Sequence, residues 1–459
     1  RFKSSYNHLM KIEQLISPLD NRYNNKIVDL ANNFSESNLN RVRFEIEIEW
    51  LIFLCSKGGK NFPALSKAKI KDLQVLKSGF DEKSAKKIKS IESKTNHDVK
   101  AVEYYIRDEL KKSTSLRKYE HLVHFALTSE DVNSLSYAIL MRDALIIYLK
   151  QLDVIIKELN RRARTWSSIP MLARTHGQAA SPSTLGKEMK VFVERLKRQR
   201  NSLKTMKPLA KFGGATGNYH TLVISDPKIN WANQTKKFLA SFQVEQNPIT
   251  TQIEPHDGIA EVAHCIQRVN NILIDFNQDI WMYIANDLFK LKLKEGEVGS
   301  STMPHKVNPI DFENSEGNLG LSNAMMEFFA NKLTKSRLQR DLSDSTVLRN
   351  LGVGFAYSYV GFSSVLKGLS KLQPNKQKAI NELENNWQIL AEAIQIVMKL
   401  EGLDNAYEII KLKTRGVSLD QNSYAELVEN LEISEAAKDK LKKLTPTNYL
   451  GDAIKLAKL

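Results

Sequence analysis

The chain has 459 residues, of which 42% are hydrophobic and only 20 are glycine and 12 proline. This length predicts two or three domains with a large buried core, and the scarcity of turn-forming residues favours a mainly helical protein and argues against an all-β one. The formal net charge of +15 is compatible with nucleic acid, a membrane surface or a small acidic substrate as the partner.

The distribution of charge, cysteine and apolar residues narrows these choices. The basic residues are scattered, with Lys-rich stretches at 67–89 and 435–443 and no interleaved aromatic residues to stack bases, so a nucleic-acid partner is not expected. Cys55 and Cys265 lie in apolar-periodic segments, which predicts two buried thiols in a reducing compartment, and no zinc-binding spacing occurs. No apolar run approaches the roughly eighteen residues of a membrane helix, and no secretory segment opens the chain. We therefore expect a cytoplasmic protein without a membrane partner. Residues 1–9 precede Met10 and are either an extension or an expression remnant, so the fold prediction leaves them out.

The first segments are predicted to be a polar turn and a helix. The turn Ile16–Tyr23 is rich in Pro, Asp and Asn and ends in Arg22 and Tyr23. This cation and phenol could hold a phosphate, although such residues are more often only exposed. From Leu39 to Cys55 apolar residues alternate with Arg and Glu, a pattern typical of a strand. We predict a helix there nevertheless, because the flanking sequence is helix-forming.

Residues 82–111 are predicted to form a helix that is interrupted at Thr95–Asp98. An apolar stripe then resumes at helical spacing, so the interruption is a helix start, which Thr95 or Asn96 could cap. His97 stands beside Asp98, and a carboxylate next to an imidazole would fix its orientation and raise its basicity. The four residues are therefore either a plain cap or part of a site.

Another helix start lies at Thr128–Asp131, where hydroxyl and acidic residues precede an apolar stripe that runs to Leu159. Capping alone explains these residues. A helix N-terminus also favours anions, so Thr128 and Ser129 could instead donate hydrogen bonds to a bound carboxylate.

His176 lies in the polar loop Ala173–Gln178, just before a helix-start signal at Ser181–Thr184. A histidine in a loop most often has only a structural role, although this one has an unusually polar setting between Arg, Thr, Gly and Gln. Farther on, a glycine-rich turn at 213–218 and a polar loop at 250–257 precede a helix of about thirty residues with one continuously apolar face. Several long helices of this kind predict an elongated bundle whose apolar surface favours self-association.

Residues 296–309 form the most irregular stretch of the chain, with two glycines, two prolines and three consecutive hydroxyl residues between two long helical segments. Small residues let the backbone approach a ligand, successive N–H groups can bind an anion, and Lys306 and Asn308 add a cation and an amide. The stretch is either a plain surface loop or a site for a carboxylate or an oxyanion. A further helix is predicted to run from it to about Lys332.

Three arginines and several hydroxyl residues occur together at Ser336–Arg349. Their spacing suits a phosphate, but Asp341 and Asp344 could equally neutralise the arginines at the surface. Beyond Lys371 the sequence has ordinary amphipathic helices with Lys and Glu faces, which predicts a smaller C-terminal domain.

Together these motifs resemble those of bacterial-type adenylosuccinate lyases, in the fumarase/aspartase superfamily. The stretch Gly296–Pro309 is similar to the superfamily's signature loop, and its His after Met-Pro narrows the match towards adenylosuccinate lyases. Three further motifs narrow the match: Thr-Asn-His-Asp-Val-Lys at 95–100, Gln-Ile-Glu-Pro-His-Asp at 252–257 and Arg-Asp-Leu-Ser-Asp-Ser-Thr-Val-Leu-Arg-Asn at 340–350. The similarity extends from about Ile12 to the C-terminus.

The resemblance implies a fold and a reaction. The fold is all-α with three domains, namely an N-terminal helical domain (1–116), a central bundle of long helices (117–366) and a C-terminal helical domain (367–459). The chain would form a homotetramer whose active sites are shared between subunits. The reaction is β-elimination of fumarate from adenylosuccinate, giving AMP, and from the succinyl-carboxamide ribotide SAICAR, giving AICAR, without a metal or organic cofactor.

The same resemblance assigns roles to individual residues, with Ser300 as general base and His176 as general acid. Because a serine hydroxyl is a weak base, Lys306 and Asn308 would stabilise its alkoxide and the charge that builds on the substrate carboxylate. The residues assigned to the nucleotide side are Arg22, Tyr23, Arg340, Ser345 and Arg349. Thr346, Val347 and Leu348 are assigned to substrate binding without a more specific role. Those assigned to the succinyl group and the reaction centre are Asn96, His97, Asp98, Thr128, Ser129 and Gln252.

Two alternatives remain open. Another fumarate-releasing lyase, such as argininosuccinate lyase, needs no phosphate site and would ignore AMP. A non-catalytic helical RNA-binding protein would bind RNA with a steep salt dependence and release no fumarate.

Overall fold

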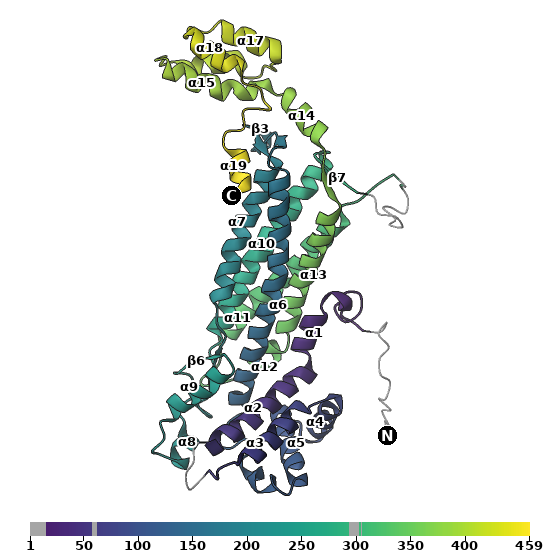
Figure 1. The fold of residues 1–459 in the computed structure, drawn as a ribbon, viewed down its shortest axis with the longest axis vertical. Coiled ribbons are helices and arrows are strands. Elements are labelled where there is room, and N and C mark those ends of the chain that lie inside the picture. The colour runs from purple at the N-terminus through teal and green to yellow at the C-terminus, as the bar shows by residue number, and fades with distance from the viewer. Residues whose placement is uncertain (1–14, 57–61, 293–302, 304) are drawn as a thin grey trace. The chain divides into compact units, whose positions relative to one another are not determined.

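The computed structural model describes residues 15–56, 62–292, 303 and 305–459. These residues are mostly helical (Figure 1), and the strands among them are two or three residues long and pair in four two-stranded sheets. The prediction of an all-α protein is confirmed.

The chain divides into two compact units. The first contains Arg1–Gln151, Arg200–Asn270 and Asn318–Gly361, and the second contains Leu152–Gln199, Asn271–Gly317 and Phe362–Leu459. Five long helices contribute residues to both units: α6 (Ser129–Thr165), α7 (Leu185–Thr205), α10 (Asp257–Ala285), α11 (Ile310–Leu333) and α13 (Leu351–Lys371). Helices α6, α7, α10 and α11 each follow a polar segment in which the sequence predicts a helix start or a loop. The three predicted domains, with limits near 116 and 366, remain a prediction beside these two units.

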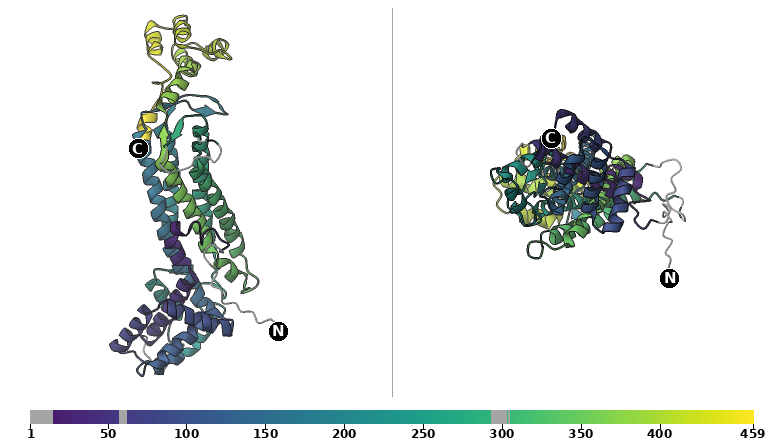
Figure 2. Two further views of the ribbon diagram at one scale, coloured as in Figure 1. Left: turned by 90° about the vertical axis from the view of Figure 1, so that its right-hand side faces the viewer. Right: turned by 90° about the horizontal axis from the view of Figure 1, so that it is seen from below.

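The first unit contains most of the shorter N-terminal helices, which lie next to one another in Figures 1 and 2. Its helices are η2 (Asn24–Lys26), α1 (Val28–Phe34), α2 (Glu36–Ser56), α3 (Lys67–Ser78), α4 (Glu82–Thr95), α5 (Asp98–Lys112), η3 (Arg117–Leu122), α8 (His220–Ser225), α9 (Trp231–Ser241) and α12 (Ser343–Leu348). Its strands β5 (Leu209–Ala210) and β6 (Glu245–Gln246) pair in parallel.

Helix α2 confirms the prediction of a helix where the sequence alternates like a strand. The alternation arises because α2 is buried on most sides, and its buried polar residues have partners inside the protein. The Arg43 guanidinium donates from Nε to Asn133 Oδ1 at 3.0 Å, and Glu47 Oε2 accepts from the backbone N–H of His124 at 3.0 Å. Charged residues in the interior, not a strand, therefore produce the period of two.

Aromatic rings form a core in this unit around Trp50. Its ring lies 4.9 Å from that of Phe212 and 5.0 Å from that of Phe238, both edge-on, and the three residues are at most 2% exposed. Edge-on pairs place the positive ring edge against the negative ring face, which adds about 1 kcal/mol per pair to the burial of the rings. This core fixes α2 against α9 and the segment that follows β5.

Helices α4 and α5 are separated as predicted, but by a different cap. Asp81 and Ser84 form a capping box at the start of α4. Asn96 has a φ of 51° and ends α4 as its C-cap, and the N-cap of α5 is His97. The expectation that Thr95 or Asn96 caps the second helix is therefore wrong.

The second unit combines the ends of the long helices with the C-terminal helices. Its further helices are α14 (Lys376–Glu384), η4 (Trp387–Leu390), α15 (Ala391–Leu400), α16 (Ala406–Thr414), α17 (Gln421–Glu429), α18 (Glu435–Lys442) and α19 (Ala453–Lys458). Its strands are β1 (Pro170–Met171), β2 (Arg174–Thr175), β3 (Gln178–Ala179), β4 (Ser183–Thr184), β7 (Phe289–Leu291) and β8 (Leu372–Pro374). The C-terminal helices surround a hydrophobic core that includes Trp387 and Tyr424, whose rings lie 5.3 Å apart.

Two further expectations concern burial. Cys55 and Cys265 are both buried thiols, as predicted, and burial raises the pKa of Cys55 to about 11. None of the helices in the described part of the chain is both long and apolar enough to cross a membrane.

Candidate active site

Asp98, at the start of α5, lies between two guanidinium groups. Its Oδ2 is 2.8 Å from Nη2 of the buried Arg43 and 2.7 Å from Nη2 of Arg349. Burial acts to raise the pKa of Asp98, but the two arginines and the N–H of Val99 outweigh it and lower the pKa to about 2. Asp98 is thus ionised at any physiological pH and ties α2, α5 and the end of α12 together.

His97 is oriented by the backbone rather than by Asp98. Its Nδ1 accepts a hydrogen bond from the N–H of Lys100 at 3.3 Å, whereas Asp98 Oδ1 is 3.9 Å away. The expectation that Asp98 holds the imidazole is wrong, because the two guanidiniums bind Oδ2 and the N–H of Val99 donates to Oδ1 at 2.8 Å. Since Nδ1 is an acceptor, the neutral ring carries its proton on Nε2, and half of the side chain is exposed.

Arg340 connects two of the predicted binding segments. Its Nη1 donates to Gln252 Oε1 at 3.0 Å, and its Nη2 lies 3.2 Å from Oε2 of the buried Glu130. The Gln252 amide in turn donates to the carbonyl of Ala215 at 3.0 Å. One arginine therefore joins the segment before α12, the 250–257 loop and the start of α6.

A buried ion pair lies next to the Glu130–Arg340 contact, at the start of α6. Lys211 Nζ lies 2.6 Å from Asp131 Oδ1 and donates to the carbonyl of Gly214 at 2.6 Å, and both charged side chains are at most 1% exposed. Asp131 also accepts from the N–H of Thr128 at 2.9 Å and from that of Gly214 at 3.1 Å. The predicted acidic cap of α6 is confirmed in Asp131, which also fixes the glycine-rich turn.

Gly217 explains why that turn is glycine-rich. Its φ is 76°, and a Cβ there would lie 2.2 Å from the carbonyl oxygen of Thr250. Any side chain would force the turn and the 250–257 loop apart. The close approach of these two backbones places Ala215 within reach of Gln252.

Helix α12 carries four of the residues assigned to substrate binding. Ser345 and Thr346 are at least partly accessible, whereas Val347 and Leu348 are 8% and 3% exposed, so a ligand could meet the last two only at their backbone. Asp341 accepts from the N–H groups of Arg337 and Ser343, and Asp344 accepts from that of Ser345. These two carboxylates fold the segment, while Arg340 and Arg349 pair with Glu130 and Asp98 instead.

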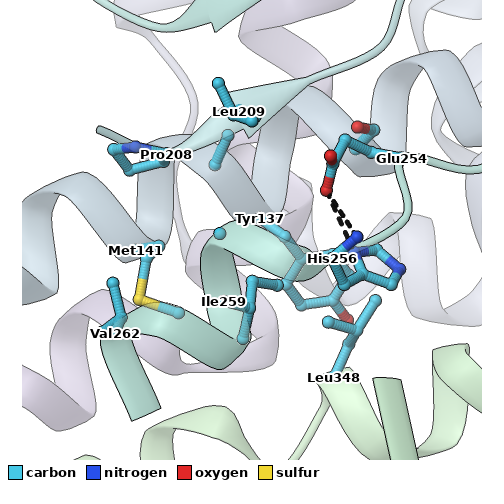
Figure 3. Close-up of a pocket in the computed structure, with 12 residues that line it drawn as sticks. Tyr137, Met141, Pro208, Leu209, Glu254, His256, Ile259, Val262 and Leu348 are labelled. Atoms are coloured by element: carbon cyan, nitrogen blue, oxygen red, sulfur yellow. Dashed lines mark hydrogen bonds and ion pairs between the residues drawn. The ribbon is translucent and has the colours of Figure 1, made fainter. Parts of the chain in front are cut away.

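His256 lies behind this arrangement, beside a small cavity (Figure 3). Its backbone N–H donates to Glu254 Oε2 at 2.7 Å. Its ring Nε2 is 3.7 Å from Asp344 Oδ2. Figure 3 shows Tyr137 and Leu348 next to the imidazole. The cavity of about 20 Å³ has room for about one water molecule and is too small for a nucleotide.

The raised pKa of the buried Glu130 carboxyl predicts that the free energy of unfolding depends on pH. Burial raises its pKa from 4.5 to about 7, and Asp344 acts in the same direction, whereas Arg340, His256 and Lys211 oppose the rise. The folded protein thus holds a proton that the unfolded chain releases above pH 4.5, so this group's contribution to stability is present below that pH and is lost as the pH rises to 7. The glutamine of the variant Glu130→Gln does not titrate. The free energy of unfolding of this variant, relative to that of the wild type, should therefore increase by up to about 3 kcal/mol between pH 4.5 and 7.5.

Calorimetric unfolding temperatures of the two proteins at pH 5 and pH 8 measure this difference. The comparison at pH 5 is the internal control, because the glutamate there is mostly protonated and close to glutamine in shape and charge. A difference that is the same at both pH values would contradict a raised pKa at Glu130.

In the second unit, His176 is at the tip of a two-residue hairpin between β2 and β3. Arg174 pairs with Ala179 and Thr175 with Gln178, which leaves His176 and Gly177 as the turn. Their φ values of 53° and 74° are those of a type I′ turn, which matches the twist of a hairpin. A non-glycine residue in this conformation is uncommon, and the His176 side chain is exposed.

The other predicted site residues in question are Ser300, Lys306, Asn308, Arg22 and Tyr23. Ser300 lies outside the described residues; Lys306 is exposed and Asn308 partly exposed, both in the second unit. Arg22 lies over the ring of Tyr23 with its guanidinium carbon 6.0 Å from the centroid, and Tyr23 packs on α13. Within residues 15–56, 62–292, 303 and 305–459, no three His, Cys, Asp or Glu side chains are grouped so as to hold a metal ion.

The structure thus brings two groups of predicted residues together in the first unit, Asp98 with Arg349 and Gln252 with Arg340. Around these residues the structure also places side chains that the sequence patterns did not identify as functional. They are Arg43, Glu130, Asp131, Lys211, Glu254, His256 and Asp344. A signal existed for two of them, because Arg43 and Lys211 each stand directly between two apolar residues.

Comparison with known proteins accounts for these motifs. A family model described as "Lyase" matches residues 21–325, and one described as "Adenylosuccinate lyase C-terminal" matches residues 336–450. The adenylosuccinate lyase of Escherichia coli K12 is 47% identical over 444 residues, which cover 96% of this chain and 97% of that protein. That of Legionella pneumophila strain Corby is 49% identical over 445 residues, which cover 96% and 98%.

Solved structures show the same fold at lower identity. A fumarate lyase from Mesorhizobium sp. BNC1 superposes with a TM-score of 0.75 at 18% identity, over 93% of this chain and 96% of that one. The 3-carboxy-cis,cis-muconate lactonizing enzyme from Pseudomonas putida gives a TM-score of 0.72 at 18% identity, over 93% and 94%. The predicted fumarase-like all-α fold is confirmed, and with the two family models and the near full-length relatives, the chain belongs to the adenylosuccinate lyase family.

Proposed function

We propose that the chain is a carbon–nitrogen lyase that cleaves adenylosuccinate to AMP and fumarate, and SAICAR to AICAR and fumarate. The observation that carries this proposal is the 47–49% identity to adenylosuccinate lyases over 96% of the chain. The motifs at 95–100, 252–257 and 340–350 are complete within that length. The alternative of a different fumarate-releasing lyase is not favoured, because the family model that matches residues 336–450 is described as "Adenylosuccinate lyase C-terminal" and the near full-length relatives are adenylosuccinate lyases.

The chemistry needs one base and one acid. Ser300 would remove the proton from the carbon next to a substrate carboxylate, the electrons of that bond would form the new double bond, and the carbon–nitrogen bond would break. His176 would give a proton to the departing nitrogen. Lys306 and Asn308, which follow Ser300 in the loop, would stabilise the serine alkoxide and the charge on the carboxylate.

The arginines around α12 support a phosphate site. A guanidinium has five N–H donors, and Arg349 uses Nη2 on Asp98 while Arg340 uses its two terminal nitrogens on Gln252 and Glu130. Each retains donors for a phosphate, and each is held in place before a ligand arrives. We assign Arg22, Tyr23, Ser345 and Thr346 to the same side of the substrate, and Asn96, His97, Thr128, Ser129 and Gln252 to its succinyl part.

We also propose a homotetramer with shared active sites and a cytoplasmic location. Large apolar side chains are exposed along the long helices, among them Ile146 on α6, Trp281 on α10 and Phe328 on α11, at 62%, 47% and 54%. Exposed apolar residues on successive helices favour burial against further copies of the chain. Two buried thiols suit the reducing conditions of the cytoplasm.

Fumarate release from adenylosuccinate by the purified chain tests the function. We expect saturable release, followed by ultraviolet absorbance, with AMP identified as the second product. Light scattering of the same preparation measures whether the active species has the mass of four chains. Release from argininosuccinate but not from adenylosuccinate would contradict the substrate, and RNA binding without any fumarate release would contradict the reaction.

A further inference from the structure

The hairpin that carries His176 is anchored in the core of the C-terminal helices. Leu172, two residues before β2, is 3% exposed and belongs to the hydrophobic cluster that also contains Leu383, Trp387 and Leu390. Strand β1, which precedes it, lies against α14 and pairs with β4. The chain therefore enters the hairpin from a buried position among residues more than 200 positions away in sequence.

Two carboxylates of the C-terminal helices hold the two sides of the hairpin. Arg174, on β2, forms an ion pair with Glu382 of α14. Ser181, two residues after β3, donates from its hydroxyl to Glu392 Oε2 of α15 at 2.5 Å. The Tyr449 hydroxyl donates to the same oxygen of Glu392 at 3.1 Å and so fixes that carboxylate.

The hairpin needs such support because little else restrains its tip. Residues 174–179 are exposed, the ladder has only two residue pairs, and the N–H of Ala180 adds one bond to the carbonyl of Ala173 at 2.9 Å. A two-stranded hairpin of this length is not stable by itself in water. The left-handed conformation of His176 is kept only if the surrounding structure holds both strands in register.

We propose that Glu382 and Glu392 are positioning residues for His176, through the hairpin that they hold on both sides. The inference rests on the proposed function, in which His176 is the general acid. A displaced hairpin would move the imidazole away from the departing nitrogen without removing any group that binds the substrate. The C-terminal helices would thus contribute to the chemical step without touching the reacting atoms.

Charge-neutral, isosteric variants test this. Glu382→Gln and Glu392→Gln are combined in one protein, and Glu384→Gln on the same helix α14 is the matched control. Glu384 is exposed and forms no hydrogen bond or ion pair with the hairpin, whose residues all lie in the described part of the chain. A misplacement of about 1 Å can cost up to about 100-fold in rate, so we expect the double variant to lower kcat by about tenfold, with KM changed by less than about twofold. The control should retain the wild-type kcat.

The same two substitutions made together with His176→Asn separate positioning from a general loss of structure. If the carboxylates act through His176, they should change the residual kcat of His176→Asn by less than about twofold. An equal loss in both backgrounds, or no loss in the wild-type background, would overturn the proposal. A wild-type protein that releases no fumarate would remove the proposed function itself, and this inference with it.

Exchanging the charges of Arg174 and Glu382 tests their ion pair independently of the glutamine variants. Arg174→Glu alone should lower kcat, because it places two carboxylates together at the base of the hairpin. Adding Glu382→Arg restores an ion pair of opposite direction and should recover most of the lost rate. Failure of the exchange to recover any rate would argue against a role of this contact in holding the hairpin.

Discussion

Ser300→Ala is expected to lower kcat by about 10³-fold or more while the protein keeps its fold and its affinity for AMP. A general base contributes about 10²- to 10⁴-fold to a proton transfer, and here the proton is a weakly acidic one next to a carboxylate. A loss of 10³-fold corresponds to about 4 kcal/mol of transition-state stabilisation. Fumarate release under saturating adenylosuccinate and AMP binding by calorimetry measure the two quantities separately.

The neighbouring serine is the matched control for this variant. Ser301→Ala removes a hydroxyl from the same stretch of chain, one residue away. We expect it to retain at least about a tenth of the wild-type kcat, because it is not assigned to the proton transfer. If the two variants had equal rates, or if Ser300→Ala retained the wild-type rate, Ser300 would not be the base.

The sequence predicts the helical scaffold and the position of its polar breaks well. Apolar stripes at helical spacing identify α6, α10 and α11, and hydroxyl or acidic residues identify where α6 and α7 begin. The structure confirms the Asp131 cap of α6, and Thr184 Oγ1 accepts from the N–H of Lys187 at the start of α7. These features are local, so neighbouring residues contain all the information that they need.

Partners across the fold could not be predicted in this way. The Asp98 carboxylate stands next to His97 in the sequence, yet its charge partners come from residues 55 positions before it and 251 positions after it. Coulomb attraction to two guanidiniums outweighs proximity to one imidazole that already accepts a backbone hydrogen bond. Likewise, the sequence identifies Glu130 only as an acidic residue at a helix start, and only the fold shows that it pairs with Arg340.

The conformation of the His176 hairpin is an intermediate case. The sequence identifies a polar loop there but not a hairpin, because each strand has only two residues and no alternating pattern. A histidine followed by glycine is a weaker version of the Asn-Gly signal for a type I′ turn, since both tolerate positive φ. The turn could have been expected from that pair, whereas its anchor among the C-terminal helices could not.

His176→Asn is expected to lower kcat by about 10² to 10⁴-fold, the usual contribution of a general acid. Asparagine is the informative replacement because it tolerates the left-handed φ of 53° at this position, whereas alanine would add strain to the loss of the imidazole. It also keeps a hydrogen-bonding side chain but cannot give a proton to the departing nitrogen.

Gln178→Ala is the matched control, because it removes a polar side chain from β3 of the same hairpin without changing the turn. It should retain most of the wild-type kcat, while KM for adenylosuccinate stays nearly constant in both variants. A low kcat in both variants would show that the hairpin as a whole matters and not the imidazole. A wild-type kcat in His176→Asn would mean that another group protonates the nitrogen, and His97, whose neutral ring carries its proton on Nε2, would be the next residue to test.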